Sequence, residues 1–243
     1  MALRRIGDLF AEVHGSGRPA VVALHGWARR GADFAAVLQG MDAVALDLPG
    51  FGATPAPEGV MTTAEYADQV ASAIDDVGGG AKTIVGHSFG GRVAVRLAVR
   101  RHDLVERLVL TGVPLVRLRP PGRPPLGYRL LRTGHRFGMV SDERMERIRR
   151  SRGSVDYRSA GGTMRDILVA AVNESYEDDL HQIECPVDLV WGADDSEVPA
   201  EVAERVRTIL DDRGVPTRLV VVPGAGHLLP LEAPEALRGV IAR

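Results

Sequence analysis

The stretch that decides the fold is a strand-like run that passes directly into a helix-like segment: Thr83-Ile84-Val85-Gly86-His87-Ser88-Phe89-Gly90-Gly91. Its centre matches the pattern G-x-S-x-G, with Ser88 between two glycines. This pattern is typical of a serine on a very tight turn between a strand and a helix, and the glycines leave the space that the turn needs. We therefore expect the Ser88 hydroxyl to be exposed above a helix amino terminus, where negative charge is favoured.

Short apolar runs alternate with amphipathic segments on both sides of this turn. Uninterrupted apolar runs are typical of strands that are buried on both faces. We expect strands at Val21–Leu24, Ala43–Leu46, Thr83–Val85, Leu108–Leu110, Val187–Trp191 and Leu219–Val222. We expect helices at Gly31–Leu38, Thr63–Val77, Gly90–Arg101, Ala200–Asp211 and Glu232–Ala242. This alternation predicts an α/β fold with a mostly parallel central sheet flanked by helices.

The alternation is interrupted after Thr111. Five prolines within Val113–Pro125 exclude a regular helix or a central strand there. The strand pattern resumes only at Val187. We therefore predict a core of residues 1–112 and 185–243, with residues 113–184 inserted as a helical lid after the strand at Leu108–Leu110.

Two helices are expected inside this insertion. Ser141 is placed to cap a helix over Asp142–Arg150, whose early acids and late arginines suit the helix dipole. A second helix carries six residues on one face, namely Met164, Ile167, Leu168, Ala171, Val172 and Ser175.

Length and composition exclude several protein classes. The chain has 243 residues, of which 45% are hydrophobic, which excludes a wholly disordered chain. No apolar run reaches the roughly 18 residues that span a bilayer. The first residues lack the apolar segment of a secretory signal. One cysteine, Cys185, excludes an internal disulfide and a cysteine-based zinc site. We expect a cytoplasmic protein with no metal, no cofactor and no membrane span.

The charge is unevenly distributed, although the formal net charge of −2 gives no reason to expect nucleic acid as a partner. The segment Leu115–Arg158, called the basic stretch below, holds 12 arginines and 4 acids and has a net charge of +8. The rest of the chain therefore carries −10. Two interpretations remain open, a solvated surface and a docking surface for an acidic partner.

A serine hydroxyl needs a base to become a nucleophile, and the chain offers seven histidines. His227 follows the last strand in a glycine-rich loop, and it comes after Ser88, as the order Ser…Asp/Glu…His requires. The orienting acid is expected after the preceding strand, and we choose Asp195. Asp194 and Glu197 are the alternatives, and we expect them to face solvent or to cap the helix near Pro199.

An acyl-transfer site also needs donors for an oxyanion. The segment Leu24–Trp27 follows an early strand, where such a loop is expected. We expect the backbone N–H groups of Trp27 and Phe89 to be these donors. His25 is expected to hold the loop by hydrogen bonds, and His87 to be a packing or pocket residue.

Taken together, these motifs resemble the α/β-hydrolase superfamily. The matching stretches are His25–Trp27, Asp47–Gly52, Gly86–Gly91, Trp191–Asp195 and Gly224–His227, with Glu232 and Pro234 beyond. The resemblance covers the chain from about Val13, except Val113–Glu184, which takes the place of the family's variable lid. It implies the α/β-hydrolase fold, with this helical lid inserted after the sixth strand of the family's sheet. Within Asp47–Gly52 it implies a tight structural turn, so Asp47 is not expected in the triad.

The resemblance implies a serine hydrolase that cleaves a carboxylic ester through an acyl-enzyme. Ser88 excludes branches that use an aspartate nucleophile, and Leu228 excludes lyases with a lysine beside the catalytic histidine. The chain is similar in length to small carboxylesterases such as pimeloyl-carrier-protein methyl ester esterases, whose basic lid receives an acidic carrier protein. The alternatives are a thioesterase, lactonase, amidase or C–C bond hydrolase on the same triad, or a non-catalytic binding protein.

Overall fold

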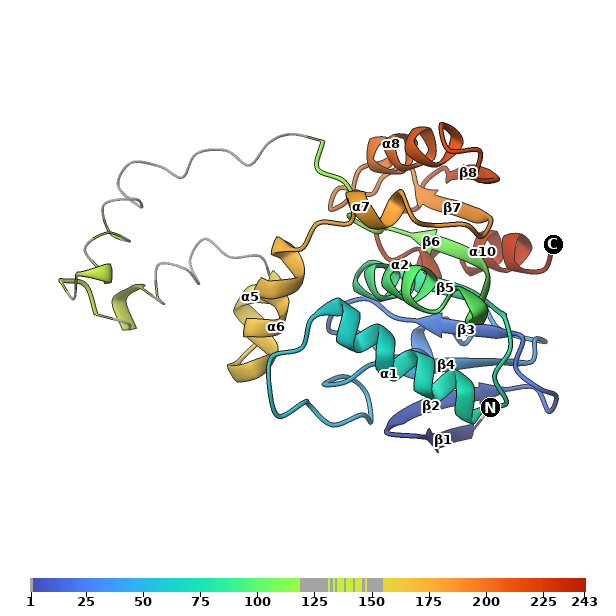
Figure 1. Cartoon of the computed structure of the whole chain (residues 1–243), viewed down its shortest axis with the longest axis horizontal. Helices are drawn as coiled ribbons and strands as arrows, with labels where there is room; N and C mark the ends of the chain where they lie inside the picture. Colours follow the sequence, from blue (N-terminus) through green and yellow to red (C-terminus); the bar gives the residue numbers. More distant parts are fainter. Residues whose placement is uncertain are drawn as a thin grey trace.

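The computed structural model describes residues 2–118, 131, 133, 135–137, 139–141, 143–145, 147 and 155–243. The described strands form one sheet in the order β1-β2-β4-β3-β5-β6-β7-β8 (Figure 1). The bounds are β1 Ala2–Ile6, β2 Leu9–His14, β3 Val21–Leu24, β4 Ala43–Asp47, β5 Lys82–His87, β6 Val105–Thr111, β7 Val187–Gly192 and β8 Thr217–Val222. Strands β3 to β8 are parallel, and β2 is antiparallel to β1 and β4. The predicted parallel α/β sheet is confirmed.

Helices cover both faces of this sheet. The α-helices and short 3-10 helices (η) are η1 Gly31–Phe34, α1 Thr63–Asp76, α2 Phe89–Arg100, η2 His102–Leu104, α5 Val155–Ser159, α6 Gly162–Asn173, α7 Glu177–Leu180, α8 Ala200–Asp211, α9 Leu229–Glu232 and α10 Pro234–Ile241. Helices α1, α2 and α8 pack against one face, while η1, α9 and α10 pack against the other. Among the described helices, none is long and apolar enough to cross a bilayer.

Strand β3 is apolar throughout because its successive side chains enter two different cores. In β3, Val22 and Leu24 lie in the core under α1, α2 and α8, while Val21 and Ala23 lie in the core under η1 and α10. Every residue of β3 is therefore buried.

Two predicted helices are wrong in their extent. Only Gly31–Phe34 of the segment Gly31–Leu38 forms a helix, and it is of the 3-10 type without a side-chain cap. The carboxyl-terminal segment is divided at Ala233, whose non-helical backbone (φ −143°, ψ 57°) separates α9 from α10. Pro234 causes the break, because a residue before proline avoids the helical conformation.

The described part of the insertion contains α5, α6 and α7, all between β6 and β7. The Arg144 amide donates to Ser141 Oγ at 3.3 Å, as expected of a cap, but Asp142 and residues 148–150 lie outside the described residues. Because residues 119–130 and other parts are also outside, the boundaries 113–184 stay a prediction.

Helix α6 differs from the expected pattern at its end. Ile167, Leu168 and Ala171 are buried, but Val172 is 53% exposed and the helix ends before Ser175. Because successive residues are about 100° apart around a helix, Val172 lies about 80° from Met164. It is therefore at the edge of the buried stripe.

Asp47 holds the turn that the sequence analysis assigned to it. This buried carboxylate ends β4 and accepts hydrogen bonds from the amides of Gly31 at 2.7 Å and Ala53 at 2.8 Å. It therefore ties the segment after β3 to the turn after β4, and its structural assignment is confirmed.

We expect Asp47→Ala to lower the free energy of unfolding by about 3 kcal/mol, because two amides lose their acceptor in a buried setting. Urea denaturation measures this loss. Asp42→Ala is a matched control, because Asp42 also accepts from two amides, those of Ser16 and Gly17, but is exposed. Equal losses in the two variants would contradict the prediction.

Candidate active site

Ser88 lies on the tight turn that the sequence predicts. It follows the last residue of β5 and precedes the first residue of α2, with φ 49° and ψ −112°. A positive φ is strained for a residue with a side chain, and such strain persists only where the surroundings hold it. A Cβ on Gly90 would lie 2.3 Å from the Leu24 carbonyl oxygen, so the turn needs glycine at that position.

His227 and Asp195 meet at the carboxyl edge of the sheet. His227 Nδ1 and Asp195 Oδ2 are 2.9 Å apart, and the Asp195 side chain is 1% exposed. Asp195 Oδ1 accepts from the amides of Glu197 at 2.9 Å and Val198 at 2.8 Å. The two amides hold the carboxylate in place, and its second oxygen faces the imidazole.

The charges around this pair shift both pKa values. Burial by itself raises the pKa of Asp195, but hydrogen bonds from His227 and from the Val198 amide outweigh it, and the net shift is downward. Burial by itself lowers the pKa of His227, but the hydrogen bond to Asp195 and the negative charges of Asp195, Glu197 and Asp156 give a net rise. An ionised carboxylate beside an imidazole ready to accept a proton is the electrostatic arrangement that general-base chemistry needs.

The two alternative acids occupy different places. Asp194 is exposed. Glu197 is also exposed, but its Oε2 lies 3.8 Å from His227 Nε2, on the other side of the ring from Asp195. Neither acid caps α8, whose amino terminus has no side-chain cap. Of the three acids, Asp195 is therefore the one bonded to His227 Nδ1.

Ser88 and His227 line one pocket with a volume of about 230 Å³. The remaining lining residues are Trp27, Ala28, Arg29, His87, Asp156, Glu197 and Leu228. Asp156 belongs to α5, so the insertion contributes to the wall. The convergence of loops after β3, β5, β7 and β8 follows from parallel strands, whose carboxyl ends meet at one edge.

The loop after β3 lies against the serine turn. The Trp27 and Phe89 rings are both buried and contact each other edge to face, with centroids 5.2 Å apart. Both side chains also contact Phe51, so the loops carrying the two expected donor amides are packed together. His25 holds this loop, as expected, because its Nε2 accepts from the Leu48 amide at 3.0 Å.

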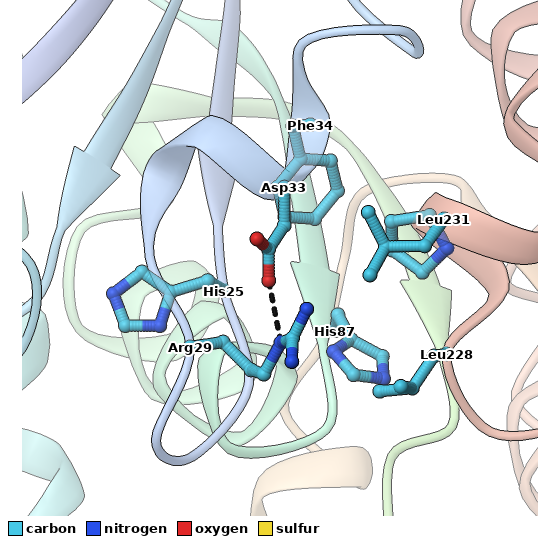
Figure 2. Close-up of a pocket in the computed structure, with 8 residues that line it drawn as sticks. His25, Arg29, Asp33, Phe34, His87, Leu228 and Leu231 are labelled. Atoms are coloured by element: carbon cyan, nitrogen blue, oxygen red, sulfur yellow. Dashed lines mark hydrogen bonds and ion pairs between the residues drawn. The ribbon is translucent and has the colours of Figure 1, made fainter.

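Three residues around the site had no role assigned to them from the sequence. Arg29 lines the pocket and forms an ion pair with Asp33, which Figure 2 shows between His25 and His87. Glu232 accepts hydrogen bonds from the Gly226 and Leu228 amides, on either side of His227. An acid five positions after a loop histidine was the available signal for Glu232. No local signal existed for Arg29 or Asp156.

Comparisons with known proteins identify the family. A family model described as the alpha/beta hydrolase family matches residues 21–240. The chain is an alpha/beta hydrolase. This hydrolase is 26% identical to a pimeloyl-[acyl-carrier protein] methyl ester esterase of Nitrosomonas europaea, over 95% of this chain and 96% of the relative. It is 27% identical to a 2-hydroxy-6-oxo-2,4-heptadienoate hydrolase of Pseudomonas putida, over 93% and 84%.

Solved structures agree on the fold of this hydrolase. A bromoperoxidase from Bacillus anthracis superposes with a TM-score of 0.74 at 18% identity, covering 99% of this chain and 98% of that one. At this identity the likeness extends to the fold alone. The expected fold class and the expectation of an enzyme of the hydrolase type are confirmed.

Proposed function

We propose that this hydrolase cleaves carboxylic esters through an acyl-enzyme formed on Ser88. The observation that carries the proposal is one pocket shared by a serine on a strained turn and by a histidine bonded to a buried carboxylate. Relatives named as esterases support the ester as substrate.

The proposed steps follow from the positions of these groups. His227 Nε2 takes the Ser88 Oγ proton as the oxygen attacks the acyl carbonyl, and Asp195 stabilises the resulting imidazolium. The Trp27 and Phe89 amides donate to the oxyanion, each contributing about 3 kcal/mol in the transition state. The alcohol leaves with the proton from His227. Water, activated by the same imidazole, then releases the acid and restores Ser88.

A fluorophosphonate probe tests the nucleophile directly. We expect Ser88 Oγ to displace fluoride and to become the single labelled residue. The tryptic peptide Thr83–Arg92 carries Ser88 as its only serine, so mass spectrometry locates the label without ambiguity. An unlabelled wild-type protein, or a label elsewhere, would refute the proposal.

Glu197 predicts a change in pH dependence. The base must be neutral to act, so kcat/KM falls as the pH drops and His227 becomes protonated. Because the pKa of His227 is raised, we expect this acid limb of the pH profile at a higher pH than an ordinary histidine would give. Glu197→Gln removes a negative charge 3.8 Å from Nε2, so the pKa of His227 falls and the limb moves to lower pH. At pH 5.5 we expect kcat/KM of Glu197→Gln to be roughly two-fold higher than that of the wild type. The gain is small because solvent screens the charge of an exposed carboxylate.

The control for this experiment is Glu201→Gln, an exposed acid on α8. In both variants we expect the plateau of kcat/KM at high pH to match that of the wild type. In Glu201→Gln we also expect the acid limb of the pH profile to stay where it is in the wild type. A limb that stays in place in Glu197→Gln would contradict the assignment of His227 as the base.

A second candidate activity is hydrolysis of a C–C bond on the same triad. The 27% identity to a hydrolase of a 2-hydroxy-6-oxo-dienoate supports it. A substrate panel of p-nitrophenyl esters, acyl thioesters, a lactone, an amide and a vinylogous 1,5-diketone separates the alternatives. We expect the highest kcat/KM for an ester.

The basic stretch supports an acidic carrier protein as the bearer of the acyl group, as in the relatives named for a carrier-protein substrate. Charge reversal of Arg144, Arg147 and Arg150 to Glu is expected to raise KM for a carrier-linked ester and to leave KM for a p-nitrophenyl ester unchanged. KM for the carrier substrate should also rise steeply with salt. A salt-independent KM would favour a merely solvated surface.

A further inference from the structure

His87 is a buried histidine that the proposed proton transfers do not use. It ends β5, directly before Ser88, and is 4% exposed. Its Nε2 lies 2.9 Å from the backbone carbonyl oxygen of His227, a residue 140 positions away in the sequence. Figure 2 shows the His87 ring next to Leu228, which follows His227.

The hydrogen-bonding partner determines the protonation of this ring. A carbonyl oxygen only accepts, so Nε2 must carry a proton and donate it. Burial, together with the charge of His227, lowers the pKa of His87 to about 3, so the imidazole is neutral and Nδ1 is unprotonated. An imidazole in this state has its basic nitrogen turned away from His227, and it does not compete with His227 for the Ser88 proton.

The opposite side of the ring faces the loop after β3. A Cβ on Gly26 would lie 2.7 Å from His87 Nδ1, so the loop approaches the ring closely only because position 26 is glycine. The His87 and His227 rings also contact each other, with centroids 4.9 Å apart. One side chain thus lies between the loop that carries Trp27 and the loop that carries His227.

We propose that His87 is a positioning residue, whose Nε2–H fixes the His227 backbone and thereby aims the His227 imidazole at Ser88. The inference rests on the proposed function, in which His227 is the base. A loop histidine held on one ring nitrogen by Asp195 can still swing about that bond. The bond from His87 to the His227 carbonyl removes this freedom, with Glu232 holding the neighbouring amides.

The test compares three variants of His87 and a control. Gln places an amide nitrogen close to the position of Nε2 and can donate to the same carbonyl, while Leu and Ala cannot donate. The control is His14→Leu, since His14 is also buried but lies at the end of β2, opposite the first residue of β4, at the other edge of the sheet. In each variant, the serines that react with a fluorophosphonate are counted, and kcat for p-nitrophenyl butyrate is expressed per reactive serine. KM for the same substrate and Tm are measured as well.

We expect His87→Leu and His87→Ala to lower kcat per active serine by about ten-fold to a hundred-fold, with KM within about two-fold, because a misplaced base slows the chemical step. His87→Gln should recover kcat to within about three-fold. The acid limb of the pH profile should persist in all three variants, since His227 remains the base. His14→Leu should keep the wild-type kcat even where Tm falls.

The outcomes that overturn the inference are distinct. An unchanged kcat per active serine in His87→Leu removes the positioning role, as does a His87→Gln variant as slow as His87→Leu. A loss explained entirely by fewer labelled serines points to folding alone. Loss of the acid limb would make His87 itself a base. An inert, unlabelled wild type would instead refute the proposed function, and this inference with it.

Discussion

Ser88→Ala is expected to lower kcat/KM for p-nitrophenyl butyrate by about 10⁴-fold or more, because no other group at the turn can form the acyl-enzyme. The alanine variant should fold like the wild type, because the Ser88 side chain makes no capping hydrogen bond at the start of α2. Steady-state rates together with Tm measure both effects. Turnover at the original rate would end the assignment of Ser88.

Ser88→Gly provides a matched control for the strain at this turn. Glycine adopts a φ of 49° without the steric cost that serine and alanine share. We therefore expect Ser88→Gly to be as inactive as Ser88→Ala but more stable by about 1 kcal/mol in urea denaturation. Such a difference would identify strain that the wild type keeps in order to present its hydroxyl.

Asp195→Asn is expected to lower kcat by about 10³- to 10⁴-fold with little change in stability. The amide oxygen can still accept from the Glu197 and Val198 amides, so the local structure is retained. Its NH₂ group, however, would face His227 Nδ1 and force the proton onto Nε2. An imidazole protonated at Nε2 cannot take the proton from Ser88.

The neighbouring acid gives the comparison for this variant. Asp194→Asn changes an exposed side chain one position away and should leave kcat within about two-fold. A large loss in Asp194→Asn and none in Asp195→Asn would show that the orienting acid was chosen wrongly.

Much of the sheet could be predicted because its central strands are buried on both faces. Val21–Leu24 has one core on each side, so both alternating sets of residues must be apolar and the strand is recognisable without its neighbours. The segment Gly31–Leu38 had no such constraint. Its first amide is held by Asp47, 16 positions away, and only one 3-10 turn forms. A contact of this kind leaves no local pattern.

The sequence by itself determined the α/β order of elements, the serine turn and the place of His227 after the last strand, because each depends on neighbours in the chain. Tertiary structure decided which of three adjacent acids meets His227, that Arg29 and Asp156 share its pocket, and that His87 reaches the His227 carbonyl. Those contacts join loops that the sheet's register brings together across many positions of sequence. Local pattern could not specify them, because each partner lies outside the sequence window in which periodicity is read.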